Sequence, residues 1–233
     1  MEGLYISASG IANALRRNDV TAHNVANLGT AGYRAARAES VELASGGAAL
    51  GSISRDDSSG PIEVTGQSMD VAVSAGFFRV RAPDGATAFT RDGHFGLNAD
   101  GEVVTADGAR LDPPIQVPGN ATHVSVTRDG AVYATVPGGA GPEMVGRLEV
   151  FRFANPDGLL AIGGNLYRQT PASGEPVAVP GATEFYPGAV QGSNVNLARE
   201  TTNSVLDRHA FQANVNAFRA QSDMLGELIN IVG

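Results

Sequence analysis

The stretch GLYISASGIANALRRNDVTAHNV, residues 3–25, decides the fold because its apolar side chains recur in alternating steps of four and three residues. This spacing keeps one face of a helix turned toward a partner helix. The face consists of Leu4, Ala8, Ile11, Leu15, Asn18, Ala22 and Val25. The stretch FQANVNAFRAQSDMLGELI, residues 211–229, repeats the pattern with Phe211, Val215, Phe218, Ser222, Leu225 and Ile229. Two such helices meet each other or meet copies of themselves, which indicates an assembling protein.

The C-terminal helix carries a second apolar stripe, made of Leu206, Ala210, Ala213, Ala217, Ala220 and Met224. At 100° per residue, the two stripe centres lie roughly 130° apart around the helix. Asp207, Asn214 and Gln221 separate the stripes on one side. A helix with two apolar stripes has neighbours on two sides, and only one other long helix is expected in this chain. The second stripe therefore favours self-assembly over a helix buried in a monomeric bundle.

Between the two helices the apolar residues alternate, as is typical of strands. We expect residues 61–189 to form a central antiparallel β-rich domain with many hairpins, because Asp-Gly pairs suit type I′ turns, in which both central residues have positive φ. These pairs begin at Asp84, Asp92, Asp100, Asp107, Asp129 and Asp157. Residues 35–60 are small and polar and are expected to be an irregular connecting segment. The predicted fold is mixed α and β, with residues 1–34 and 190–233 forming a coiled-coil-like helical domain.

Composition excludes several classes of function. The net charge of −8 argues against nucleic-acid binding, which requires a basic face. The chain has no Cys, so neither disulfides nor thiolate metal sites are possible. No apolar run approaches the roughly 18 residues of a membrane span, so we expect no membrane insertion. Residues 1–10 lack the basic start and apolar stretch of a secretory signal, so any export is expected to use another route.

The sequence offers little support for an enzyme. The four histidines are scattered, without the His-x-x-x-His spacing of a zinc site. The segment around Ser68 lacks the final glycine of a nucleophile elbow. The Asp-Gly pairs lack the preceding carboxylates of a calcium loop. A carboxylate pair for glycoside hydrolysis stays open, although nothing specific nominates one. We expect no catalytic residues, no cofactor and no metal.

Two regions resemble the signature segments of the bacterial flagellar rod and hook axial proteins. The first, NVANLGTAGYR at residues 24–34, resembles their Asn-Asn-x-Ala-Asn-x-x-Thr-x-Gly-Tyr motif, with matching residues at Asn24, Asn27, Thr30, Gly32 and Tyr33. His23 replaces the first Asn of this motif, and Ala31 stands where Pro is usual. The second region runs from Thr65-Gly66 through TRDGHF at residues 90–95 to NADG at residues 98–101. Segments at residues 193–197 and 211–214 complete a resemblance that covers nearly the whole chain.

The resemblance implies a structural subunit of the flagellar basal-body rod. Such proteins are exported unfolded through the flagellar type III apparatus without a cleaved signal peptide. Their terminal helices order on assembly and line a tube that spans the periplasm, transmits torque and conducts later subunits, while the β domain forms the outer layer. The implied partners are copies of itself, other rod and hook axial proteins, and the export apparatus. The connection after Arg34 looks short for a distal rod or hook subunit, which favours the proximal rod.

On this interpretation the functional residues are contact residues. The expected assembly interface consists of Leu4, Ile11, Leu15, Val25, Leu206, Phe211, Val215, Phe218, Leu225 and Ile229. The motif residues Asn24, Asn27, Thr30, Gly32 and Tyr33 are expected to shape the joint between the first helix and the β domain. The alternatives are that these are ordinary core residues of a monomer, that the chain is a distal rod or hook subunit, or that it is a secreted β-rich adhesive or binding protein.

Overall fold

The computed structural model describes residues 2–181 and 184–232, which divide into two compact units. The helical unit contains Met1–Leu28, Ala35–Asp56 and Val195–Gly233. The β unit contains Gly29–Arg34 and Asp57–Asn194. The chain therefore contributes three separate segments to the helical unit.

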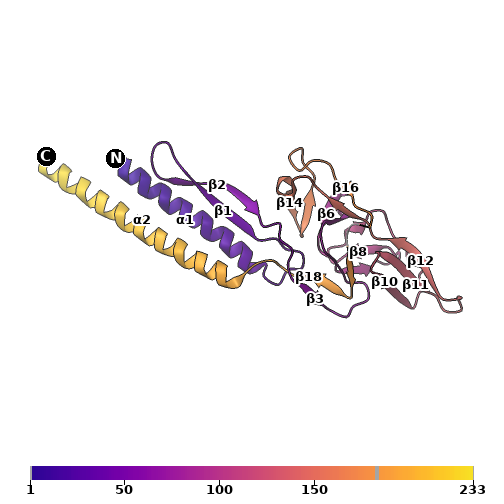
Figure 1. The fold of residues 1–233 in the computed structure, drawn as a ribbon. Helices are drawn as coiled ribbons and strands as arrows, with labels where there is room; N and C mark the ends of the chain where they lie inside the picture. The colour runs from indigo at the N-terminus through magenta and orange to yellow at the C-terminus, as the bar shows by residue number, and fades with distance from the viewer. Residues whose placement is uncertain (1, 182–183, 233) are drawn as a thin grey trace. The chain divides into compact units, whose positions relative to one another are not determined.

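Two long helices form the frame of the helical unit, as predicted. Helix α1 spans Glu2–Ala26 and helix α2 spans Leu197–Val232, and within this unit they lie side by side and run in opposite directions (Figure 1). Asn196 caps α2 because its side-chain Oδ1 accepts a hydrogen bond of 3.0 Å from the backbone N–H of Arg199. Helix α1 closes with a tight turn in which the N–H of Asn27 donates to the carbonyl of Asn24 at 3.1 Å.

The segment 35–60, expected to be irregular, instead contains a β-hairpin, so that prediction was wrong. Strands β1 (Ala36–Glu42) and β2 (Ala48–Arg55) pair antiparallel, with a register shift between Glu39 and Ser40. All of their side chains are exposed or half-buried. A strand that buries so little lacks the strong alternation of apolar residues from which strands are recognised. The hairpin belongs to the helical unit, where the side chain of Asn24 on α1 bonds the backbone of Ala36.

The β unit consists of short strands and one 3₁₀ turn, η1 (Pro156–Gly158). The strands are β3 (Ile62–Val64), β4 (Val71–Val73), β5 (Phe77–Arg81), β6 (Thr87–Thr90), β7 (Phe95–Leu97), β8 (Val103–Thr105), β9 (Arg110–Leu111), β10 (His123–Val126), β11 (Ala131–Thr135), β12 (Pro142–Arg147), β13 (Val150–Arg152), β14 (Leu160–Gly163), β15 (Leu166–Arg168), β16 (Val177–Ala178), β17 (Phe185–Pro187) and β18 (Ala189–Gln191).

All pairings in the β unit are antiparallel, which confirms the predicted central β-rich region. The largest sheet has the strand order β14-β15-β6-β5-β9-β8-β7, and β13 joins it by pairing with β5 and β16. A smaller sheet has the order β10-β11-β12, and two further pairs are β17-β4 and β18-β3. The last two pairs tie the end of the β unit to its beginning.

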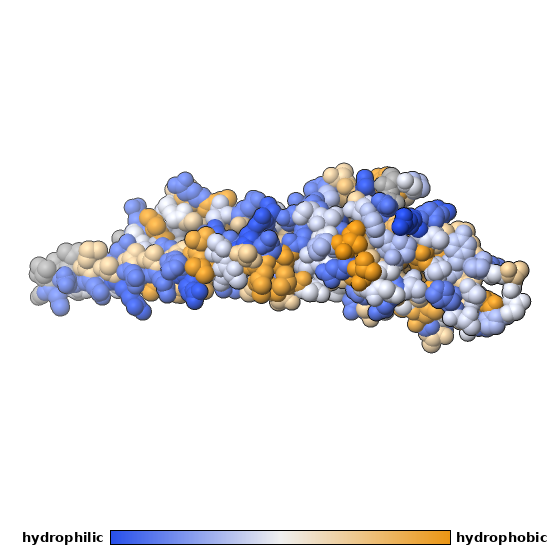
Figure 2. Space-filling model, turned by 60° about the horizontal axis from the view of Figure 1, so that its bottom comes forward, coloured by the Kyte–Doolittle hydropathy of each residue, from blue (hydrophilic) through white to orange (hydrophobic). Residues whose placement is uncertain are grey.

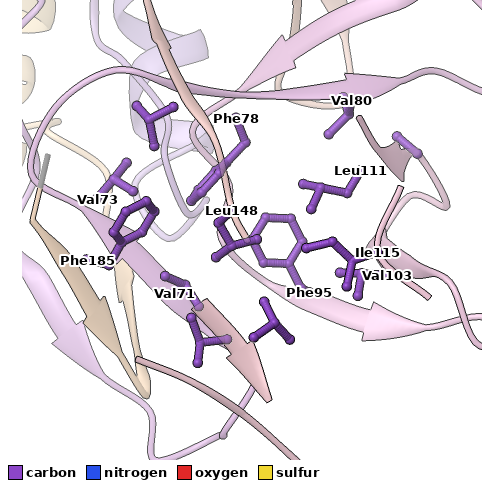
Figure 3. Close-up of a cluster of buried hydrophobic side chains, with 14 of the residues drawn as sticks. Val71, Val73, Phe78, Val80, Phe95, Val103, Leu111, Ile115, Leu148 and Phe185 are labelled. Carbon is purple, nitrogen blue, oxygen red and sulfur yellow. The ribbon is translucent and has the colours of Figure 1, made fainter. Parts of the chain in front are cut away.

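The core of the β unit is built from the inward-facing residues of these strands. Phe78, Phe95 and Phe185 come from different strands and lie among aliphatic side chains such as Val71 and Leu148 (Figure 3). The rings of Phe78 and Phe95 meet edge to face with centroids 5.0 Å apart. This mutual burial is the main source of stability for a domain of short strands.

The turns differ from the predicted type. At four of the six Asp-Gly pairs the glycine alone adopts a positive φ, for example 81° at Gly85 and 80° at Gly130. Around Gly85 the backbone N–H of Ala82 donates to the carbonyl of Ala86, and that of Gly85 donates back to Ala82, which is a three-residue loop rather than a type I′ turn. Gly93 and Gly158 do not have a positive φ at all. Within the described part of the chain, Asn165 is the one non-glycine residue with a positive φ, in the hairpin between β14 and β15.

Candidate assembly surface

The face of α1 that contacts α2 is made of small and polar residues. Gly3, Gly10 and Arg17 of this face meet side chains of α2. They belong to a series of small and polar residues at alternating steps of four and three: Gly3, Ser7, Gly10, Ala14, Arg17, Thr21 and Asn24. Ser7, Ala14, Thr21 and Asn24 are buried. This small and polar face precedes the predicted apolar face by one residue, a rotation of about 100° around the helix.

Three pairs of facing residues, called layers, join this face of α1 to α2. They are Arg17 with Asp207, Gly10 with Asn214 and Gly3 with Gln221, and together they form the polar seam. Arg17 donates from Nε to Asp207 Oδ1 at 2.8 Å. A Cβ atom on Gly10 would lie 2.5 Å from Asn214 Oδ1, and one on Gly3 would lie 2.8 Å from Gln221 Oε1. The two glycines therefore make room for the amide side chains of α2. Beside the first layer, Ser204 Oγ donates to Asn18 Oδ1 at 3.2 Å.

The predicted interface residues of α1 lie beside the polar seam. Leu4 and Ile11 are half-buried, whereas Leu15 and Val25 are 51% and 39% exposed. Leu15 lines a surface groove of about 360 Å³ together with Phe211 of α2. The structure thus brings Leu15 and Phe211 together at the rim of the helix pair, and it leaves Val25 in solvent.

The predicted interface residues of α2 are spread over two faces. Phe211, Val215 and Leu225 are half-buried, whereas Leu206 and Phe218 are 57% and 38% exposed. Ile229 lies in α2, but its side chain is outside the described residues. The second apolar stripe of the sequence is exposed at every position: Leu206, Ala210, Ala213, Ala217, Ala220 and Met224. In Figure 2 a row of apolar side chains runs along the helical unit beside hydrophilic ones.

The first motif residues fix the end of α1 within the helical unit. Asn24 is 1% exposed, and its side-chain amide bonds both backbone groups of Ala36: Nδ2 donates to the carbonyl and Oδ1 accepts from the N–H, each at 2.8 Å. Asn24 thereby extends the hydrogen bonding of the hairpin to the helix. Asn27 Nδ2 donates to the carbonyl of His23 at 2.8 Å and so bonds the last turn.

The remaining motif residues hold the segment 29–34 within the β unit. The N–H of Gly32 donates to the carbonyl of Gln191 at 2.7 Å, and the carbonyl of Tyr33 accepts from the N–H of Asn194 at 3.3 Å. Gly32 has a φ of 69°, and a Cβ atom there would lie 2.8 Å from the backbone carbonyl carbon of Arg91. Thr30 accepts at its carbonyl from the N–H of Tyr33. Glycine is therefore required at position 32 by both conformation and space.

A buried pair of arginines in the β unit was missed by the sequence analysis. The guanidinium carbons of Arg34 and Arg91 lie 5.4 and 4.8 Å from the ring centroid of Phe77. Arg34 forms an ion pair with Asp57, whereas Nε and Nη1 of Arg91 are buried without a hydrogen-bond partner. Burial, followed by the nearby charge of Arg34, lowers the pKa of Arg91 to about 10. No sequence pattern marks Arg91 as buried, because arginine is normally a surface residue.

The described residues contain no cluster of three or more His, Cys, Asp or Glu side chains that could hold a metal ion. His94 is the histidine with acidic neighbours: its Nδ1 lies 3.0 Å from Asp92 and its Nε2 lies 4.0 Å from Asp70. Asp70 also accepts a hydrogen bond of 2.6 Å from Thr65, so these groups connect neighbouring turns of the β unit. Over the described residues, neither helix has an apolar stretch long enough to cross a membrane.

Known proteins resemble this chain along almost all of its length. A family model described as the flagellar hook protein FlgE/F/G D1 domain matches residues 73–134, and one described as the flagellar basal body rod FlgEFG protein C-terminal region matches residues 186–231. The flagellar basal-body rod protein FlgG of Buchnera aphidicola from Acyrthosiphon pisum is 33% identical, with 97% of each chain covered. FlgG of Bacillus subtilis is 32% identical, with 99% of each chain covered. The rod protein FlgF of Mesorhizobium japonicum is 28% identical, with 100% of this chain and 98% of the relative covered. The chain therefore belongs to the family of flagellar basal-body rod proteins.

Proposed function

We propose that this structural subunit of the flagellar basal-body rod polymerises through the outer faces of α1 and α2. The observation that carries the proposal is the composition of the contact between the two helices. Small and polar residues occupy its centre, while Leu15, Leu206, Phe218 and Met224 remain exposed. Large apolar side chains on two long helices are costly to leave in water, and burial against neighbouring subunits would remove that cost.

The assembled form follows from the geometry of such a contact. Helices that present apolar faces on both sides pack against two neighbours each, and repetition of one such contact generates a helical filament. We infer a tube lined by the terminal helices, which transmits torque and conducts exported subunits, and we assign the chain no enzymatic activity. The motif residues Asn24, Asn27, Thr30, Gly32 and Tyr33 would hold the joint between helix and β unit under that load.

The inferred partners are copies of the same chain, neighbouring rod and hook axial proteins, and the flagellar type III export apparatus. We place the subunit in the part of the rod that crosses the periplasm, on its proximal side. The short segment 35–60 supports the proximal position. Export without a cleaved signal would leave the mass of the subunit in basal bodies equal to that of the translated chain.

Electron microscopy of basal bodies from a strain lacking this gene tests the proposal. A rod that stops short, with rings left in the inner membrane, is expected, and the point at which growth stops gives the position of the subunit. Complete rods and hooks would overturn the proposal and favour a secreted adhesive protein, whose terminal helices would stay folded in the isolated chain.

A point variant separates an assembly face from an ordinary core. Phe218→Asp places a charge on the exposed part of α2 and should block rod formation while the thermal unfolding of the purified chain changes little. Asn216→Asp adds a charge on the polar side of the same helix and should leave rods intact. Loss of monomer stability in Phe218→Asp would show that this side chain belongs to the core of a monomer.

A further inference from the structure

The polar seam follows a single register. Residues 3, 10 and 17 of α1 are seven apart, as are residues 207, 214 and 221 of α2. They meet in opposite order, as Gly3 with Gln221, Gly10 with Asn214, and Arg17 with Asp207. A seven-residue repeat keeps one face of each helix toward the other over several turns. All three layers therefore define the same antiparallel alignment of α1 and α2.

We propose that the polar seam selects the partner of α1 and its register, so that α1 pairs with α2 of the same chain and the apolar stripes are kept for other subunits. The second part of this statement rests on the proposed function, whereas the first does not. Polar groups within a helix contact are known to fix register at some expense of stability. Here the three layers supply two kinds of recognition element: an ion pair in one layer and a glycine facing an amide in the other two.

A slip of the helices by one heptad breaks the ion pair in either direction, although one glycine still faces an amide: Gly3 faces Asn214 in one direction and Gly10 faces Gln221 in the other. In one direction Asp207 comes opposite Gly10 and in the other Arg17 comes opposite Asn214, so the carboxylate of Asp207 loses Arg17 in both cases. Asp207 is 4% exposed, and a buried carboxylate without a partner is strongly unfavourable. At the glycine layers, a side chain larger than hydrogen would overlap Asn214 or Gln221.

The same chemistry rejects an apolar partner. If the apolar stripe of a second copy took the place of α2 beside α1, it would offer no hydrogen-bond acceptor to Arg17. If α2 in turn packed against an apolar stripe, its Asp207 and Asn214 side chains would face hydrocarbon. Desolvated polar groups without partners discriminate between competing contacts more sharply than apolar area does. The polar seam thus separates the pairing within one chain from the contacts between chains.

Disulfide mapping tests the register, because the full chain contains no cysteine of its own. Asn18→Cys with Ser204→Cys places a pair across the observed hydrogen bond. Val25→Cys with Ser204→Cys reports a slip of one heptad, about 10 Å along the axis and beyond the reach of a disulfide. Both pairs are oxidised in the purified full-length chain and in isolated basal bodies, and intrachain bonds are quantified by mass spectrometry. The first pair should form at least about ten times more disulfide than the second.

Apolar substitution of the seam should remove this preference. In a variant carrying Arg17→Leu, Asp207→Leu and Asn214→Leu, the ratio of the two disulfides should fall at least about fivefold, and bonds between chains should appear. The matched control carries the same exchanges at exposed positions of the same helices: Arg16→Leu, Asp223→Leu and Asn216→Leu. The control should keep the parent ratio. An unchanged ratio in the seam variant, or equal disulfide yields in the parent, would overturn the proposal.

Charge exchange provides a second test if the apolar variant does not fold. Arg17→Asp and Asp207→Arg should each lower the yield of the Asn18–Ser204 disulfide, and the two together should restore it. Failure of the double variant to restore the yield would overturn the role of the ion pair. A chain that forms the expected disulfide but is missing from basal bodies would contradict the proposed function while leaving the polar seam as inferred.

Discussion

At the scale of single residues, Arg91 carries a charge at a position that solvates it poorly. Burial lowers the pKa of Arg91 to about 10, so at neutral pH the folded state holds its proton at a cost of about 3 kcal/mol. Stacking on Phe77 offsets about 1–2 kcal/mol of this cost. Arg91→Met should therefore raise the free energy of unfolding at pH 7 by about 1 kcal/mol, measured by urea titration of tyrosine fluorescence.

The stability difference between Arg91→Met and the parent should depend on pH. Because the pKa of Arg91 is lower in the folded state, the cost is fully present below about pH 10 and is relieved as the pH rises through that value. The advantage of Arg91→Met should therefore shrink above about pH 10. The control is Arg110→Met, which removes an exposed ion pair with Glu102 and should change stability by less than about 1 kcal/mol. A clear loss of stability in Arg91→Met would mean that ring stacking outweighs desolvation.

Asn24 has the opposite character, since both ends of its buried amide are hydrogen-bonded. Asn24→Ala leaves the N–H and the carbonyl of Ala36 without their side-chain partner and should lower the free energy of unfolding by about 2–4 kcal/mol, followed by circular dichroism at 222 nm. Asn27→Ala removes one hydrogen bond at an exposed turn and should lower it by no more than about 1 kcal/mol. Equal effects of the two variants would contradict a special role for Asn24.

At the scale of elements, the ion pair between the helices should show an asymmetry. Arg17→Leu leaves the buried carboxylate of Asp207 alone and should lower the free energy of unfolding by about 3 kcal/mol. Asp207→Leu frees Arg17, whose half-exposed side chain can turn to water, and should lower it by about 1 kcal/mol. The double variant should lie within about 1 kcal/mol of the parent, as a double-mutant cycle in urea would show. Strictly additive effects would contradict a direct pair.

The elements also show how far the sequence could lead. Both helices and the antiparallel middle were predictable, because their apolar periods of 3.6 and 2 are strong. The hairpin β1–β2 was not, because its strands bury few side chains and carry little apolar alternation. The contact face of α1 was also missed. Periodicity finds the most apolar face of a helix, whereas this chain buries the small and polar face that contains Gly10 and Arg17 against α2.

At the scale of the whole molecule, the helical unit leaves many of its apolar side chains exposed. The contact between α1 and α2 has a polar centre, and the second stripe of α2 is exposed along its length. Burial of that stripe would contribute mainly to the assembled state. Changes in the shape of this stripe should therefore have a large effect on the free energy of assembly. They should have only a small effect on the free energy of unfolding of the monomer.

The alanines of the second stripe allow this to be measured. Ala213→Leu and Ala217→Leu enlarge exposed positions, so in the purified chain they should change the free energy of unfolding by less than about 0.5 kcal/mol, since Ala and Leu have similar helix propensities. If neighbouring subunits approach closely over these alanines, each added side chain overpacks the contact by about 1–3 kcal/mol, and the penalty recurs at every subunit of the filament. Rods should then fail to form, as seen in electron micrographs of basal bodies and in swimming assays.

Gln212→Leu adds the same side chain to an exposed position outside the stripe and should leave rods and swimming intact. Normal rods with both alanine variants would mean that the second stripe faces solvent in the filament, and the assembly contact would then have to lie at Leu15, Phe211 and Phe218.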